Sequence, residues 1–342
     1  MASVTVAVLT FLRPADLAEL LPALADEVAA AAASTGAQID VLVIDNDPAG
    51  SAEALVVDNG VRYVCEPVPG IAAARNRALD ESRASDALVF IDDDERPRPG
   101  WLGNLVELWA RTGCAAVAGQ VESQFDGELD PWIEDGGFFR RTHTQALVTG
   151  TRVPAAATNN LLLDVHAVRR HGLEFDTSIG MAGGEDTLFT RRLVAAGESI
   201  LWCAEAIVVD CVPAARMTRR FVVRRRFAQA NVSIGVAVRL ASGLREQVNV
   251  RGRFGVTSLA RVVGGGLEAA AGTVVRRPSL QARGVARLAR GLGGTSAVVG
   301  YRFQEYRRSS PATRTSPGPH EGADHLPTRI RGRERRAARR AG

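Results

Sequence analysis

Four consecutive carboxylates, Asp92 to Glu95, follow the apolar run LVFI at 88–91. Adjacent carboxylates repel one another at low dielectric unless a cation is present. Hard oxygen ligands without His or Cys suit Mg²⁺ or Mn²⁺ rather than zinc. The run therefore predicts a divalent metal site, with a solvated acidic turn as the alternative that these residues alone leave open.

Two further positions could bind a nucleotide. Asp45 ends the run IDVLVI at 39–44, where a carboxylate can accept a hydrogen bond from a base or ribose. An Asx turn before Pro48 is the equal alternative. Arg75 lies a few residues into a helix expected after Gly70, where it could pair with a diphosphate. The alternative for Arg75 is an ordinary surface arginine on an amphipathic helix.

A second acidic pair, Glu185 and Asp186, opens an expected helix that stops at Gly197. Acidic residues at that end of a helix stabilise it by ~0.3–1 kcal/mol, so a capping role is one interpretation. The preceding Gly183 and Gly184 favour a further role, because paired glycines let the backbone approach a ligand. They also permit a plain tight turn.

The elements that must position these residues alternate between strands and helices. Apolar strands are expected at 4–9, 39–44 and 88–91, with helices over 16–33 and after Gly70, and further strands near 114–121, 158–163 and 200–209. Strands that are apolar throughout predict a parallel sheet covered on both faces, an α/β fold. In such sheets ligands bind at the carboxyl ends of the strands, which is where the acidic residues stand.

The small net charge of +4 hides two regions of opposite sign, and all 42 basic residues are arginine. Residues 1–212 hold 15 Arg and 32 acidic residues, whereas residues 213–342 hold 27 Arg and 6 acidic residues. Regions of opposite charge are expected to meet different partners. The four cysteines have no zinc-binding spacing and are too few for a disulfide framework, which favours a reducing cytosol.

Several segments together resemble one family. They are VTVAVLTFLRP, VLVIDND, GIAAARNRAL and FIDDDERPRPGWL, then TNNLLLD at 158–164 and FDTSIGMAGGEDTLFTRRLVAAG at 175–197. In this order and spacing they resemble the family 2 glycosyltransferases, over roughly residues 3–230. Within that family the sequence looks most like the bacterial exopolysaccharide (succinoglycan-type) glucosyltransferases.

The resemblance implies the GT-A nucleotide-diphospho-sugar transferase fold, with a central, mostly parallel sheet and helices on both faces. Residues 1–230 would form the catalytic domain, with a nucleotide-sugar half at about 1–112 and an acceptor half at about 113–230. A helical basic region would follow at 231–308. Residues 309–342, rich in Pro, Ser, Gly and Arg, are expected to be a disordered tail.

The resemblance also assigns roles by position. Thr10, Phe11 and Arg13 would line the base pocket, Asp45 would bind the nucleobase, and Arg75 would contact the base or the diphosphate. Asp92 and Asp94 fill the D-x-D positions, with Asp94 the preferred metal ligand, and Asp93 is assigned to cofactor binding. Because Asp93 and Glu95 flank these positions, the spacing leaves open which carboxylates touch the metal.

The implied reaction is a metal-dependent, inverting transfer of a single sugar. A UDP-sugar is the expected donor, Mn²⁺ or Mg²⁺ the cofactor, and a glycan or lipid-linked molecule of cell-surface or exopolysaccharide biosynthesis the acceptor. The acceptor hydroxyl needs a general base, for which Asp186 is the choice and Glu185 the alternative. The Q-x-x-R-W motif of processive synthases is absent. Val209–Pro213 lacks the His that many relatives carry there, which leaves Asp210 as a weak substitute.

The basic region predicts contact with a membrane. The segment 254–275 is long enough to span a bilayer, but it contains Arg261, Glu268 and five glycines. These residues are unfavourable in the hydrocarbon core of a membrane. In 283–294, arginines share one helical face and apolar residues another, as in a helix that lies in the membrane interface. The alternative is an amphipathic helix packed on the catalytic domain. The expected location is cytoplasmic, peripheral to the inner face of the plasma membrane through 254–308.

The sequence leaves two other functions open. A sugar-nucleotide nucleotidyltransferase shares the overall fold but needs a glycine-rich loop after the first strand, and residues 10–14 contain no glycine. A non-catalytic protein that uses its basic end to bind a membrane or nucleic acid is the other alternative. No aromatic-rich platform or recognition motif supports nucleic acid binding.

Overall fold

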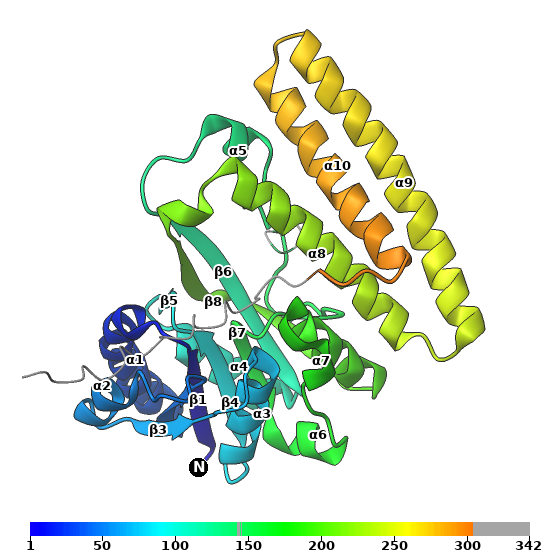
Figure 1. Ribbon diagram of the computed structural model, residues 1–342. Helices are drawn as coiled ribbons and strands as arrows, with labels where there is room; N and C mark the ends of the chain where they lie inside the picture. The colour runs from blue at the N-terminus through cyan, green and yellow to red at the C-terminus, as the bar shows by residue number, and fades with distance from the viewer. Residues whose placement is uncertain (142–143, 145, 304–342) are drawn as a thin grey trace, which may run out of the picture. The chain divides into compact units, whose positions relative to one another are not determined.

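The computed structural model describes residues 1–303 except 142–143 and 145. In this part of the chain, eight strands form one sheet in the order β3-β2-β1-β4-β7-β6-β8-β5 (Figure 1). The strands are β1 (Ser3–Thr10), β2 (Gln38–Asp45), β3 (Arg62–Cys65), β4 (Ala87–Asp92), β5 (Glu95–Pro97), β6 (Ala116–Phe125), β7 (Asn160–Asp164) and β8 (Ile200–Val212).

The helices that precede residue 200 include the three expected at 16–33, after Gly70 and from Glu185. They are α1 (Pro14–Thr35), α2 (Glu53–Asp58), α3 (Ile71–Glu81), α4 (Trp101–Thr112), α5 (Pro131–Asp135), α6 (Val165–Arg170) and α7 (Glu185–Ala195). Two short 3₁₀ helices, η1 (Thr177–Ala182) and η2 (Ala214–Arg216), flank α7 and the end of β8. The strands and helices predicted from the apolar runs are confirmed, with shifts of a few residues at their ends.

The first half of the sheet is parallel and brings the site residues to one edge. Strands β3, β2, β1 and β4 run in the same direction. In their register Thr10 stands opposite Asp45, and Leu9 stands opposite Asp92. The carboxyl ends of β1, β2 and β4 therefore meet at one place, as the sequence predicted.

The second half of the sheet is mixed. Strand β7 runs antiparallel to both β4 and β6, β8 is parallel to β6, and the short β5 is antiparallel to β8. The β5–β8 pairing places Glu95 opposite Asp210. Four of the seven strand pairs are parallel, so the sheet is parallel from β3 to β4 and mixed beyond β4.

Helices cover both faces of the sheet, which explains why the central strands are apolar on both sides. On one face α1 and α4 pack through Leu17, Leu20, Trp101 and Leu105 onto alternate residues of β1 and β4. On the other face α3, α6 and α7 contribute Ala74, Val168 and Phe189 to a second cluster. Phe175 stacks on Phe189 at 4.2 Å between ring centroids and completes this cluster.

Three long helices form the C-terminal part of the described chain: α8 (Arg219–Leu240), α9 (Leu244–Val274) and α10 (Pro278–Val298). Helix α10 lies between α8 and α9 (Figure 1). A Cβ added to Gly265 of α9 would lie 2.5 Å from the backbone nitrogen of Leu288 on α10, and one on Gly284 of α10 would lie 2.3 Å from that of Ala269. The glycines of 254–275 therefore permit backbone contact between two helices.

The packing of α10 favours the alternative for 283–294, a helix packed on the rest of the chain, while its contact with a membrane stays a prediction. The buried side of α10 is made of Ala282, Ala286, Ala289 and several glycines, packed between its two neighbours, and Arg287 is paired with Glu268 at 2.9 Å. Small residues decide the packing of α10 because they let neighbouring helices approach closely. A prediction based on the large apolar residues of one helical face does not take this into account. No helix of the described residues is long and apolar enough to cross a membrane. The predicted tail, 309–342, lies outside the described residues.

Candidate active site

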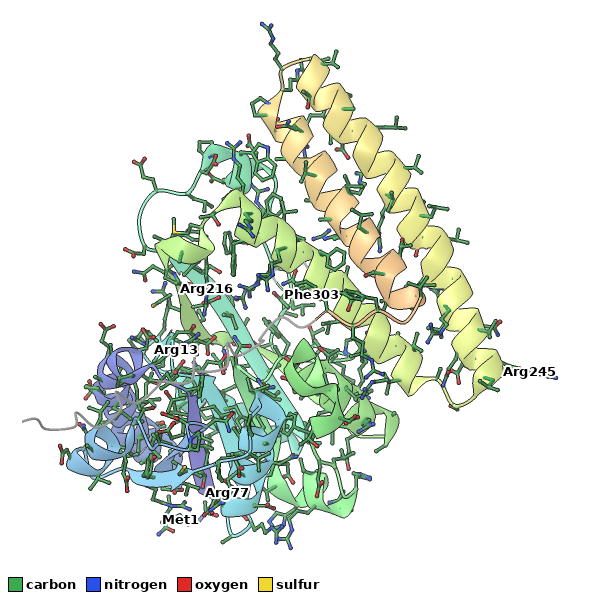
Figure 2. All side chains as sticks on the ribbon, in the orientation of Figure 1. Met1, Arg13, Arg77, Arg216, Arg245 and Phe303 are labelled. Carbon is green, nitrogen blue, oxygen red and sulfur yellow. The ribbon has the colours of Figure 1, made fainter. Side chains whose placement is uncertain are left out.

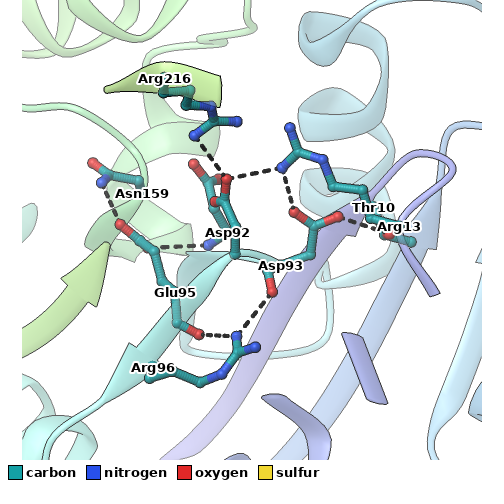
Figure 3. A network of polar contacts seen from close by, with 9 residues as sticks. Thr10, Arg13, Asp92, Asp93, Glu95, Arg96, Asn159 and Arg216 are labelled. Atoms are coloured by element: carbon teal, nitrogen blue, oxygen red, sulfur yellow. Dashed lines mark hydrogen bonds and ion pairs between the residues drawn. The ribbon is translucent and has the colours of Figure 1, made fainter. Parts of the chain in front are cut away.

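The carboxylates after β4 form a polar network with two arginines (Figure 3). Asp93 accepts hydrogen bonds from the Thr10 hydroxyl at 2.9 Å and from Arg13 at 3.0 Å. Asp94 accepts from Arg13 at 2.9 Å and from Arg216 at 3.1 Å. The guanidinium of Arg13 thus bridges two of the carboxylates, and both arginines offset the negative charge of Asp94.

The other two carboxylates of the run are crowded: Glu95 is buried and Asp92 is half-buried. The backbone amide of Asp92 donates to Glu95 at 3.2 Å, and the Asn159 side chain donates to the other oxygen of Glu95. Burial raises the pKa of Asp92 to about 7; Arg75 opposes this rise, and Asp94 and Asp93 add to it. Burial, together with Asp92, also raises the pKa of Glu95 well above its ordinary value. At this end of β4, the charged forms of Asp92 and Glu95 are therefore poorly solvated.

Arg75 and Glu185 form a buried ion pair that joins α3 to the start of α7. Both residues are 4% exposed, and the guanidinium of Arg75 also lies 5.6 Å from the ring centroid of Phe175. Burial alone would lower the pKa of Arg75. The negative charges of Glu185, Asp186 and Asp92 outweigh this effect, so the pKa of Arg75 is raised. Acidic residues of both β4 and α7 therefore act on the charge of Arg75.

Asp186 stands beside this pair at the first turn of α7. It is half-buried, and its carboxylate accepts hydrogen bonds from the backbone amide and hydroxyl of Thr187. Gly184 precedes it at a φ of +90°, and a Cβ there would lie 2.3 Å from Val232 of α8. Gly184 thus permits close approach of α8, so its role in this structure is helix packing rather than contact with a ligand.

Asp45 is buried and organises the loop after β2. One carboxylate oxygen accepts from the amide of Asp47 at 3.0 Å, and the other accepts from the amide of Ala52 at 2.9 Å and the hydroxyl of Tyr63 at 3.1 Å. The bond to Asp47 is the expected Asx turn. Contact between Asp45 and a nucleobase stays a prediction. Thr10 and Phe11 lie at the same edge of the sheet as Asp45, and their role in a base pocket also stays a prediction.

Three residues of this network carried no assigned role in the sequence. Arg216 reaches Asp94 from η2, 122 residues along the chain, and nothing in its local sequence signals this contact. Asn159 holds Glu95 from the segment before β7; it belongs to the quoted TNN motif, which was the available signal. Arg141 pairs with Asp210 at 2.8 Å. Asp210 is thereby engaged by an arginine, beside Glu95 in the sheet.

The donor chemistry at the end of β4 fits a divalent cation. Asp92 and Asp94 would supply hard oxygen ligands. Burial, more than the neighbouring carboxylates, raises the pKa of Asp92, and a bound cation would favour its charged form. Among the described residues, no three His, Cys, Asp or Glu side chains converge as a ready-made metal cage. Arg13 and Arg216 both contact Oδ2 of Asp94, so a cation at this carboxylate would share it with two guanidinium groups or displace them.

Comparisons with known proteins agree with this arrangement. Residues 5–169 match the family model described as "Glycosyl transferase family 2". Over 255 residues the chain is 34% identical to the succinoglycan biosynthesis protein ExoM of Rhizobium meliloti (strain 1021), which covers 72% of this chain and 79% of that protein.

Solved structures with similarity include S. aureus TarS 1-349, at a TM-score of 0.48 and 15% identity, covering 91% of this chain and 98% of that one. Another is GalNAc-T7 with UDP, GalNAc and Mn²⁺, at a TM-score of 0.47 and 13% identity, covering 68% and 51%. The sequence relationship over most of both chains, together with the two-faced sheet and its acidic carboxyl-end edge, identifies this protein as a glycosyltransferase of GT-A fold that belongs to glycosyl transferase family 2.

Proposed function

We propose that this protein transfers a single sugar from a nucleotide-diphosphate-sugar to a hydroxyl acceptor, with inversion at the anomeric carbon and a divalent cation as cofactor. The observation that supports it most is the link between the two acidic groups. Arg75 forms an ion pair with Glu185 at the start of α7, and the charges of Asp186 and of Asp92 at the end of β4 also raise its pKa. This link supports a donor side and an acceptor side that share the carboxyl edge of the sheet, where ligands bind in such folds.

Asp92 and Asp94 are the residues we assign to Mn²⁺ or Mg²⁺. When bound, the cation would neutralise the charge that develops on the diphosphate leaving group. We assign Arg13 and Arg216, which contact Asp94, to the phosphate oxygens of the donor, for which guanidinium groups are well suited. UDP remains the preferred nucleotide, as expected from the family resemblance.

Asp186 is the general base of this proposal. Its neighbour Glu185 is held by Arg75 in a buried ion pair and is poorly placed to change partners. Asp186 is half-buried. Within the described part of the chain, its carboxylate accepts hydrogen bonds from the neighbouring Thr187. A single base that deprotonates the acceptor hydroxyl, with direct attack on the sugar, produces inversion.

The acceptor that we propose is a glycan or lipid-linked molecule of exopolysaccharide biosynthesis. The name of the relative ExoM supports this setting. The surplus of arginine after residue 212 supports contact with the inner face of the plasma membrane, where a lipid-linked acceptor is found.

Release of nucleoside diphosphate from several nucleotide-sugars tests the donor half of the proposal without an acceptor, because slow hydrolysis reports donor choice. We expect release with Mn²⁺ or Mg²⁺ and loss of it with EDTA. Asp94→Ala and Asp186→Asn should each lower the rate at least about 100-fold.

Asp80→Asn is the matched control, since Asp80 is an exposed carboxylate whose partner is Arg83 on the surface. Its rate should equal that of the wild type. Full activity in both Asp94→Ala and Asp186→Asn would overturn the site assignment.

A further inference from the structure

Helix α9 carries an apolar face that nothing in the described chain covers. Its opposite side packs on α10 through Ser258, Gly265 and Gly272. The large side chains of the uncovered side are between 56% and 81% exposed: Val256, Leu259, Val263, Leu267 and Val274. We call these five residues the outer face of α9. Contiguous exposed apolar surface of this kind marks an interaction site.

The outer face is one continuous stripe. At 3.6 residues per turn, the separations of three, four, four and seven residues place all five side chains on the same side of the helix. At 1.5 Å per residue, the stripe from Val256 to Val274 is about 27 Å long. Ala260 and Ala270, also exposed, fall within it.

Charged residues are absent from this stripe and gather at its ends. Within 256–274 the charged residues are Arg261 and Glu268. Glu268 is paired with Arg287 of α10, and burial together with the neighbouring Arg261 lowers the pKa of Arg290, also on α10. Arg261 lies three residues after Ser258 and four before Gly265, on the side that packs on α10. Both charged residues of 256–274 therefore lie on the α10 side rather than on the outer face.

The ends of α9 are positive. Arg245 and Arg253 are exposed at the N-terminal end, where Arg245 projects from the tip of the helix (Figure 2). Arg276 and Arg277 are exposed just after the C-terminal end. The acidic residue at this end, Glu246, accepts a hydrogen bond from the backbone amide of Ser242. An apolar stripe bordered by exposed arginines is complementary to an anionic lipid surface.

We infer that the outer face of α9 is the membrane-docking surface of this protein and that it lies in the plane of an anionic phospholipid bilayer. The arginines at both ends would contact lipid phosphates while the five apolar side chains enter the headgroup boundary. Docking by α9 also leaves α10 in its packed position between α8 and α9. The inference deepens the proposed function, because it names the surface by which the enzyme would meet a lipid-linked acceptor.

Helix α8 connects this surface to the proposed base. A Cβ on Gly293 of α10 would lie 2.1 Å from the carbonyl oxygen of Phe227 on α8, so α10 and α8 are in backbone contact. Further along α8, Val232 and Val236 pack on Gly184, two residues before Asp186. Docking through α9 would thus hold α7, and with it Asp186, at a set position relative to the lipid surface.

Sedimentation of the full chain with vesicles tests the inference. We expect binding to vesicles of phosphatidylcholine and phosphatidylglycerol in equal parts, and weaker binding to phosphatidylcholine alone. The triple variant Leu259→Gln, Val263→Gln, Leu267→Gln keeps the net charge but removes apolar surface. Its affinity for the mixed vesicles should fall at least about tenfold. Arg245→Gln with Arg253→Gln should weaken binding at low salt more than at high salt.

The matched control places three glutamines at Val57, Val68 and Val148, which are exposed to a similar degree (57–71%) but belong to the catalytic part. Its vesicle affinity should stay at the wild-type level. Donor hydrolysis in solution, without vesicles, should be unchanged in the α9 triple variant, which shows that it is folded and separates this inference from the proposed function.

Three outcomes would overturn the inference. One is a wild-type chain that does not bind the mixed vesicles. The second is a triple α9 variant that binds them as well as the wild type does. The third is a wild-type dimer, seen by light scattering, that the triple variant loses, because the outer face would then bind a second copy of the chain.

Discussion

At the scale of single residues, the ion pair between Arg75 and Glu185 gives the two acidic residues of α7 different expected roles. Glu185 should stabilise the fold, whereas Asp186 is the proposed base. The side chains of Arg75 and Glu185 are almost completely buried. Removing one partner of a buried pair leaves an uncompensated charge, which typically costs 3–5 kcal/mol. Glu185→Gln should therefore lower the free energy of unfolding by about 3 kcal/mol, measured by urea denaturation.

Asp186→Asn is the comparison for this change, because it alters the neighbouring carboxylate without breaking the pair. We expect it to change the free energy of unfolding by less than about 1 kcal/mol. Equal destabilisation by the two variants would mean that the buried pair does not distinguish Glu185 from Asp186.

A second prediction at this scale concerns pH. The native pKa of Asp92 is about 7 and its ordinary value is 3.8, so between these values the native state keeps a proton that the unfolded state releases. The free energy of unfolding of the metal-free protein should therefore fall as pH rises from about 4 to about 7, by up to ~1.4 kcal/mol per pH unit for this one proton. Above pH 7 this contribution is already lost.

Asp92→Asn should flatten this pH dependence, as measured by denaturation at pH 5, 6 and 7 in buffer with EDTA. Part of the slope remains in the variant, because burial also raises the pKa of Glu95. A variant with the same slope as the wild type would show that Asp92 does not hold the proton.

At the scale of elements, Gly184 controls how closely α8 approaches the start of α7. Alanine there would have both a φ of +90° and a Cβ only 2.3 Å from Val232. Gly197, at the other end of α7, has a φ of +96° but no atom within 4 Å of an added Cβ. Gly197→Ala therefore measures the backbone cost alone, about 1–2 kcal/mol.

Gly184→Ala should cost at least about 1 kcal/mol more than Gly197→Ala, since overpacking adds to the backbone strain. Chemical denaturation of both variants gives the difference. If the two costs were equal, the contact between Gly184 and α8 would have no energetic weight.

The α9–α10 contact offers a neighbouring pair of glycines with opposite expectations. A Cβ on Gly265 would lie 2.5 Å from the backbone nitrogen of Leu288, whereas one on Gly266 would meet nothing within 4 Å. Gly266→Ala should raise the free energy of unfolding by about 0.5–1 kcal/mol through better helix propensity. Gly265→Ala should lower it by about 1–3 kcal/mol.

Thermal unfolding by circular dichroism measures both changes. Stabilisation by Gly265→Ala would contradict the backbone-to-backbone packing of these helices.

At the scale of the whole molecule, binding of metal and nucleotide should appear as global stabilisation. A ligand at 100 times its dissociation constant adds about 2.7 kcal/mol to the free energy of unfolding. We expect UDP with Mn²⁺ to raise the melting temperature and UDP with EDTA to raise it less. The Asp94→Ala variant should lose the part that depends on Mn²⁺. A UDP effect that is the same with and without metal would exclude a bridging cation.

Much of the fold and part of the site could be predicted from local sequence. Apolar runs predicted β1, β2 and β4, and their parallel order brought Thr10, Asp45 and Asp92 to one edge. The contacts between those residues could not be predicted, because they join distant segments. Arg75 and Glu185 are 110 residues apart, and Arg216 and Asp94 are 122 apart. Such pairs depend on how helices dock, which no local spacing records.

The sequence by itself determined the family, the order of strands and helices, and the identity of the acidic groups, because these follow from short-range patterns of side chains. Only the tertiary structure decided which acid is paired and which side of the basic region is uncovered. Glu185 is held by Arg75, and α10 is packed by its glycines and alanines while the large apolar residues of α9 face outward. The reason is geometric: small residues gain their packing energy from close backbone approach, which exists only once two helices meet.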